Sequence, residues 1–147
     1  MQYNTASFFC KKAFTFAPVI FFDFKSMIKL NHLNLVVSDV KAAIAFFETY
    51  FHFTCTQIKG DHVIAILKGE DDFSLVVMPA TEGDATYPKA FHLGFMFNTT
   101  EEVNDLYNKL QADDVAVGDQ PKKIRDSYGF YFHFDSVLIE VGLGPHS

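Results

Sequence analysis

The sequence predicts an α+β fold of two paired βαβββ modules, whose strands form a curved, mostly antiparallel sheet with the helices on its outer face. Three observations predict it: a strand, a helix and three strands in residues 27–80, the same order in residues 89–147, and a repeat between the two opening segments. Residues 31–39 (NHLNLVVSD) align without a gap with residues 91–99 (FHLGFMFNT). Repeated units of this kind bury their apolar faces against one another.

The first module opens with an alternating segment, residues 29–37. Its odd-numbered positions from Leu33 on are apolar and predict a buried face, while the even-numbered positions, among them His32 and Asn34, take the other face. Asp39 can cap a helix over residues 40–51, where apolar residues recur at helical spacing. Three further strands are expected at residues 53–58, 63–67 and 73–78, with turns between them.

The second module repeats this order after a polar loop. Residues 91–97 alternate in the same way and place His92 and Met96 opposite the apolar face. Thr99 and Glu102 have the spacing of a capping box, which predicts the start of the second helix. A weak strand is expected at 115–117, and stronger strands follow at 130–134 and 137–143.

Residues 27–147 are expected to form one domain, with modules at about 27–80 and 89–147. The chain has 147 residues, 49% of them hydrophobic, which is enough apolar material for one core. Residues 1–26 are rich in phenylalanine and show no period. Two interpretations remain open: they are an upstream extension before a natural start at Met27, or an arm that packs on the domain or on a partner subunit.

The charge distribution excludes some partners. A net charge of −6 argues against nucleic acid, which requires a clustered basic surface. The apolar run in the leader is too short to span a membrane. Lys122, Lys123 and Arg125 form a basic cluster, interpreted either as a solvated loop or as a small-anion site. Cys10 and Cys55 lack metal-type spacing, so we expect reduced thiols in a cytoplasmic protein.

His32, His92 and Glu140 are candidate ligands of one divalent metal ion. Strand alternation places all three opposite the helix-facing side of the sheet. A carboxylate within an apolar strand is costly to bury unless it has a partner. Two imidazoles and one carboxylate suit iron, manganese, zinc or nickel and leave coordination positions open for a substrate. The alternative is that the histidines are structural and that Glu140 pairs with a lysine.

Residues 27–143 resemble the vicinal oxygen chelate superfamily, which includes glyoxalase I, fosfomycin and bleomycin resistance proteins and extradiol dioxygenases. The resemblance rests on residues 30–39 (LNHLNLVVSD), 45–47 (AFF), 91–95 (FHLGF) and 138–141 (LIEV). It implies a glyoxalase-like fold and a metal ion held by His32, His92 and Glu140. It also implies a homodimer, since small members commonly build each site across two chains.

Departures from the family pattern narrow the implied activity. Glyoxalase I has a fourth ligand, a glutamate that also serves as the base, and the repeat places Val76 at that position. Fosfomycin resistance proteins carry an active-site tyrosine on a strand similar to residues 129–132 (GFYF), but their arginine after the final glutamate is missing here. Extradiol dioxygenases usually need two such modules and additional histidines. Ordinary forms of these three activities are therefore not expected.

The resulting hypothesis is a metal-dependent enzyme that acts on a small substrate with adjacent oxygens by Lewis-acid catalysis, as a lyase, isomerase, transferase or dioxygenase. Glu140 and Tyr131 are the candidate catalytic residues. The candidate substrate-binding residues share the strand faces of the ligands: Asn34, Val76, Met78, Met96, Tyr131 and Leu138. The alternatives are a metal-free small-molecule binding protein like the bleomycin resistance proteins, and a small-molecule sensor or immunity partner.

Overall fold

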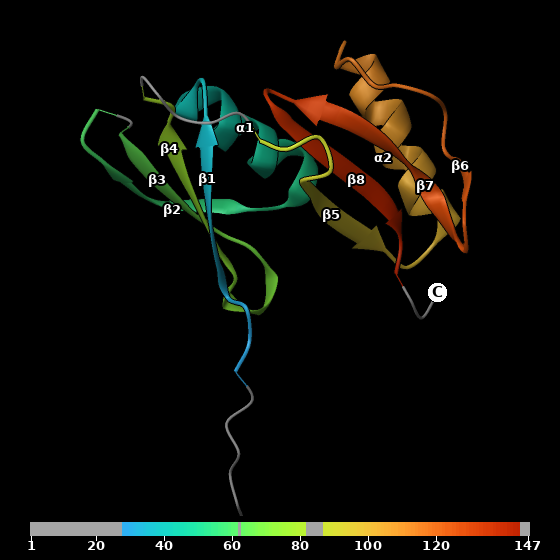
Figure 1. Ribbon diagram of the computed structural model, residues 1–147, viewed down its shortest axis with the longest axis horizontal. Helices are drawn as coiled ribbons and strands as arrows, with labels where there is room; N and C mark the ends of the chain where they lie inside the picture. Colours follow the sequence, from blue (N-terminus) through green and yellow to red (C-terminus); the bar gives the residue numbers. More distant parts are fainter. Residues whose placement is uncertain (1–27, 62, 82–86, 145–147) are drawn as a thin grey trace, which may run out of the picture.

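The computed structural model describes residues 28–61, 63–81 and 87–144 (Figure 1). The expectations for residues 1–26 and for a start at Met27 lie outside the described residues. The described chain forms two helices and two mixed four-stranded sheets, which confirms the α+β fold predicted from the sequence. No helix within these ranges is both long and apolar enough to cross a membrane.

The first module is a four-stranded sheet with one helix packed against one of its faces. Its elements are β1 (His32–Val37), α1 (Val40–Phe51), β2 (Thr54–Lys59), β3 (Ile64–Lys68), a short 3-10 turn (Glu70–Asp72) and β4 (Ser74–Pro79). The strand order is β1-β4-β3-β2, in which β1 and β4 are parallel and the other pairs are antiparallel.

The second module repeats this topology. Its elements are β5 (His92–Phe97), α2 (Thr100–Ala112), β6 (Lys122–Ile124), β7 (Ser127–Phe134) and β8 (Val137–Leu143). The strand order is β5-β8-β7-β6, and again only the first pair is parallel. The internal repeat seen in the sequence is therefore a repeat of strand order and strand direction.

Both helices begin at the caps that the sequence predicts. Asp39 Oδ1 accepts hydrogen bonds from Lys41 N (2.8 Å) and Ala42 N (3.0 Å) at the start of α1. At α2, Thr99 Oγ1 accepts from Glu102 N (3.2 Å), and Glu102 Oε2 accepts from Thr99 N (3.0 Å), which completes a capping box. These bonds satisfy backbone N–H groups that have no partner within the helix.

The core lies between each helix and the face of its sheet. The buried residues of α1 are Val40, Ala43, Phe46 and Phe47, and those of α2 are Val103, Leu106, Tyr107 and Leu110. The apolar positions of β1, β4, β7 and β8 meet them: Leu35, Val37, Leu75, Val77, Phe130, Phe132, Val137, Ile139 and Val141. The opposite faces of the strands, which carry the candidate site residues, are left without a helix.

An aromatic contact joins the two modules, and Figure 1 shows α1 between the two sheets. Phe46 stacks on Phe134 with ring centroids 3.9 Å apart, and Phe51 stacks on Phe95 at 3.7 Å. Asp135, in the turn between β7 and β8, accepts hydrogen bonds from the backbone N and the hydroxyl of Ser38 at 2.7 and 2.9 Å. The phenylalanine-rich composition therefore stabilises the contact between the modules as well as the core of each module.

The prediction of a strand at residues 115–117 is wrong. Val117 makes an isolated bridge with Phe132, and the edge strand is β6, which pairs with β7 through a two-residue turn at Arg125 and Asp126. The interpretation of Lys122 and Lys123 as loop residues is wrong as well, because both belong to this strand. β6 is short and contains two lysines, so its sequence shows no apolar alternation. Its extended conformation depends on its pairing with β7.

Candidate metal centre

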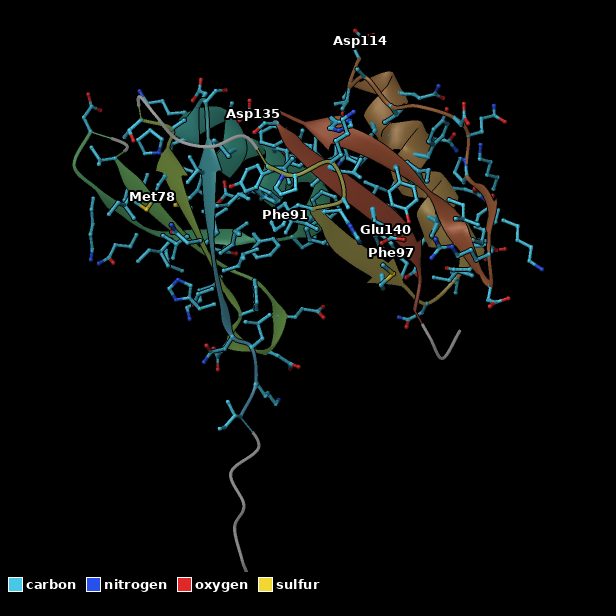
Figure 2. All side chains as sticks on the ribbon, in the orientation of Figure 1. Met78, Phe91, Phe97, Asp114, Asp135 and Glu140 are labelled. Atoms are coloured by element: carbon cyan, nitrogen blue, oxygen red, sulfur yellow. The ribbon has the colours of Figure 1, made fainter. Side chains whose placement is uncertain are left out.

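Three polar side chains come together on the uncovered face of the second sheet. Glu140 lies on β8, between Tyr131 on β7 and Gly94 on β5, and His92 lies two residues before Gly94 on the same face. Figure 2 shows Glu140 within this sheet. Strand alternation, which buries the residues on either side of Glu140, therefore turns its carboxylate toward Tyr131 and His92.

Direct contacts link these side chains. The Tyr131 hydroxyl donates a hydrogen bond to Glu140 Oε1, and His92 Nε2 lies 3.0 Å from Glu140 Oε2. The second ring nitrogen, His92 Nδ1, lies 3.0 Å from the carbonyl oxygen of Ala90. The two side chains remain partly open to solvent, with 42% of His92 and 25% of Glu140 exposed. An ion or a small ligand can therefore reach the pair.

The contact with Ala90 determines which imidazole nitrogen of His92 is available to bind a metal ion. A carbonyl oxygen only accepts hydrogen bonds, so Nδ1 carries a proton in this contact, and an Nε2 without a proton would direct its lone pair at the Glu140 carboxylate. Two acceptors this close require a proton or a cation between them. Ligands about 2.1 Å from one ion and at right angles to each other lie about 3.0 Å apart, so the pair fits two neighbouring coordination positions.

The pKa of the Tyr131 hydroxyl is raised above its ordinary value. The largest cause is its hydrogen bond to the Glu140 carboxylate, followed by burial and by the negative charge of Glu140, while the positive charge of Arg125 opposes the shift. Tyr131 is therefore a protonated donor throughout the neutral range. A donor of this kind fixes the orientation of a ligating carboxylate.

The third candidate ligand, His32, lies on β1 in the other sheet. In the described ranges, no group of three or more histidine, cysteine, aspartate or glutamate side chains is placed to hold a metal ion. One chain therefore brings His92 and Glu140 together but not His32. The arrangement across two chains that the family resemblance implies stays a prediction.

A pocket of about 930 Å³ opens beside the His92 and Glu140 pair. Of the six predicted substrate-binding residues, Met96, Tyr131 and Leu138 line it. The other three, Asn34, Val76 and Met78, lie on the first sheet, where Asn34 Nδ2 contacts Met78 Sδ at 3.2 Å. Figure 2 shows Met78 and Glu140 on different sheets. The single-chain pocket thus contains the half of the predicted set that belongs to the second module.

The strand register confirms the predicted equivalence of Val76 and Glu140. Val76 pairs with Asn34 in the first sheet, and Glu140 pairs with Gly94, the residue that aligns with Asn34, in the second. An isopropyl group cannot bind a metal ion or accept a proton. The first module therefore supplies no carboxylate at the position that is equivalent to Glu140.

Two of the three residues of the basic cluster lie at the pocket, and a small-anion site was one of the two interpretations of this cluster. Lys122 forms an ion pair with Asp119, whereas Lys123 and Arg125 line the pocket and make no ion pair within the described part of the chain. Arg125 has φ = 56°, a left-handed conformation that favours glycine or asparagine. The small-anion interpretation of this cluster therefore agrees with its position.

Comparisons with known proteins agree with this fold. The family model described as Glyoxalase/Bleomycin resistance protein/Dioxygenase superfamily matches residues 29–139. A possible glyoxalase from Bacillus cereus is 35% identical over 78% of this chain and 97% of its own, with a TM-score of 0.68. Lactoylglutathione lyase from Agrobacterium tumefaciens is 20% identical over 82% and 96% of the two chains, with a TM-score of 0.63.

A further similar structure contains a bound metal ion. It is a mutant of the fosfomycin resistance protein FosX from Listeria monocytogenes, complexed with Mn(II) and 1S,2S-dihydroxypropylphosphonic acid. It is 24% identical over 79% of this chain and 92% of its own, with a TM-score of 0.63, which shows a shared fold. No curated protein matches this chain in sequence.

Proposed function

This chain belongs to the Glyoxalase/Bleomycin resistance protein/Dioxygenase superfamily, and from that premise we propose that it is a metal-dependent enzyme acting on a small substrate with adjacent oxygen atoms. The observation that carries the proposal is the pairing of His92 Nε2 with Glu140 Oε2 at 3.0 Å on the wall of the pocket. His92 Nε2 is available to bind a metal ion because Nδ1, the other ring nitrogen, contacts the carbonyl oxygen of Ala90.

The proposed ligand set is His92 and Glu140 from one chain and His32 from a second copy. His32 and Asn34 are exposed on the uncovered face of the first sheet, beside Val76 and Met78. In the proposed homodimer this face covers the pocket of the partner, which adds the third ligand and the rest of the predicted substrate-binding residues. The ion is iron, manganese, zinc or nickel, and Mn(II) in the FosX structure supports this choice.

The side chains around the pair have separate roles in this proposal. Bound metal supplies a Lewis acid that polarises the adjacent substrate oxygens. Glu140 holds its position through the bond from Tyr131, and the Tyr131 hydroxyl can also donate to a substrate oxygen. Lys123 and Arg125 attract an anionic group into the pocket that they line. The reaction is one of the lyase, isomerase, transferase or dioxygenase class.

A metal titration tests the proposal. Purified protein freed of metal is titrated with Mn(II) and Zn(II) by calorimetry, and we expect one ion per chain. His92→Gln and Glu140→Gln should each remove this binding. His52→Asn is the control, because His52 caps α1 in a left-handed conformation that asparagine also accepts. Equal affinity in all four proteins, or no stoichiometric binding, contradicts the proposal.

One observation favours a second candidate, a metal-free small-molecule binding protein. Within the described ranges only two of the three ligands meet, and the pocket beside them is wide enough to hold a small molecule. Ligand binding that is unchanged by a chelator and by His92→Gln supports this candidate. Ligand binding that is lost with the metal supports the enzyme.

A further inference from the structure

Met96 is a large apolar side chain that lies in the pocket with 49% of its surface exposed. Three glycines surround it: Gly94, two residues earlier on β5, Gly142, its partner on β8, and Gly144 just beyond β8. A β-carbon added at each glycine would approach a different atom of Met96, at 3.8 Å from Cβ for Gly144, 3.7 Å from Sδ for Gly142 and 3.0 Å from Cε for Gly94.

These three distances give the direction of the side chain. Met96 runs from Gly144 past Gly142 to Gly94, and the β-carbon position of Gly94 is also 3.8 Å from Glu140 Oε2. The methyl end of Met96 and the Glu140 carboxylate therefore both lie next to Gly94 on the wall of the pocket. Because the glycines carry no side chains, the thioether lies low along the sheet and leaves the space above it open. We call Met96 with these three glycines the methionine floor.

We propose that the methionine floor binds an apolar substituent of the substrate, a linear alkyl or aryl group attached next to the oxygens that chelate the metal. This inference rests on the proposed function, because the methyl end of Met96 defines the wall next to His92 and Glu140. A thioether is flexible and polarisable, so it adapts to chains of different length. Each methylene that it covers should tighten binding about fourfold, which corresponds to ~0.8 kcal/mol.

Two substitutions should weaken this preference for two different physical reasons. Met96→Ala removes the side chain that contacts the substituent, so each added methylene of the substituent no longer gains this apolar contact. Gly94→Ala places a β-carbon 3.0 Å from Met96 Cε, closer than ordinary contact, so the methyl group must give way by a few tenths of an ångström. Long substituents then lose room while short ones still fit.

The experiment uses a series of n-alkyl hydroxamates, from acetohydroxamate to octanohydroxamate, whose two adjacent oxygens chelate divalent metals. Calorimetry gives the Kd of each for Mn(II)-loaded protein. We expect wild type to gain about fourfold per methylene over the first few methylenes. Met96→Ala should flatten this dependence, Met96→Leu should largely keep it, and Gly94→Ala should end the gain at shorter chains than in wild type.

The control variant is Ile58→Ala, which removes a side chain of similar exposure, 46%, on β2 outside the pocket. It should behave as wild type. Mn(II) stoichiometry measured on every variant shows that each has folded. The inference is overturned if Mn(II)-loaded variants all share the wild-type dependence on chain length, or if Mn(II)-loaded wild type binds no hydroxamate. Wild type that binds no Mn(II) contradicts the proposed function and this inference together.

Discussion

Glu140 has two side-chain partners among the described residues, and each contacts a different oxygen of its carboxylate. Tyr131 donates to Oε1, and His92 faces Oε2. The position of Glu140 was predictable from the sequence, because a carboxylate between apolar strand residues requires a partner. The bond from Tyr131 was not predictable, since the sequence placed Tyr131 against the substrate and cannot show which acceptor its hydroxyl reaches.

Tyr131→Phe keeps the ring and removes only the donor to Glu140. Because the carboxylate is then less firmly oriented, we expect Mn(II) to bind about tenfold more weakly, at the lower end of the effect of losing such a partner. Calorimetry measures the change. Tyr50→Phe is the matched control, since the Tyr50 hydroxyl also donates to a carboxylate, that of Asp113, outside the pocket residues. Equal losses in both variants contradict the role given to Tyr131.

Alkaline pH should reveal the raised pKa of Tyr131 in metal-free protein. The hydrogen bond to Glu140 favours the neutral phenol in the folded state, so the stability that it contributes is fully present below the unfolded pKa of about 10 and is lost as pH rises through the folded value. Urea unfolding between pH 8 and 11 should therefore show a smaller alkaline loss for Tyr131→Phe than for wild type. A larger loss in the variant contradicts this assignment.

At the scale of elements, the predictions were correct where a local sequence signal marks the helix or strand. Asp39 and the Thr99 capping box define the starts of α1 and α2, and apolar alternation defines β1, β5 and β8. Residues 115–117 are rich in apolar residues, but only Val117 pairs with a strand, through an isolated bridge to Phe132. β6 is mostly polar and pairs with β7. A strand of that kind is set by tertiary pairing, which a local pattern does not contain.

Lys123 on β6 and Arg125 in the turn after it should determine the affinity for anions. Lys123 and Arg125 line the pocket without an ion pair in the described ranges, so replacing either should weaken inorganic phosphate binding several-fold and reduce its dependence on salt. Lys123→Gln and Arg125→Asn are suitable, because asparagine accepts the left-handed backbone at residue 125. Lys122→Gln, which removes a lysine already paired with Asp119, is the control for phosphate calorimetry.

At the scale of the whole molecule, the repeat predicted two similar modules correctly but could not show how they face each other. The aromatic contact of α1 with Phe95 and Phe134 places the modules side by side, so that the uncovered sheet faces do not close on each other within one chain. Strand alternation assigns His32, His92 and Glu140 to uncovered faces. It does not say whether the two faces belong to one chain or to two.

Mixing two variants that each lack one proposed ligand tests most directly whether the metal site is shared between two chains. His32→Ala and His92→Ala each lack one proposed ligand, and neither should bind Mn(II) tightly alone. After the two are unfolded and refolded together, each mixed dimer contains one intact site, formed by His92 and Glu140 of one chain and His32 of the other. We predict that tight Mn(II) binding returns at one ion per mixed dimer. No recovery in a confirmed mixed dimer, or tight binding by His32→Ala alone, would contradict a site shared between chains.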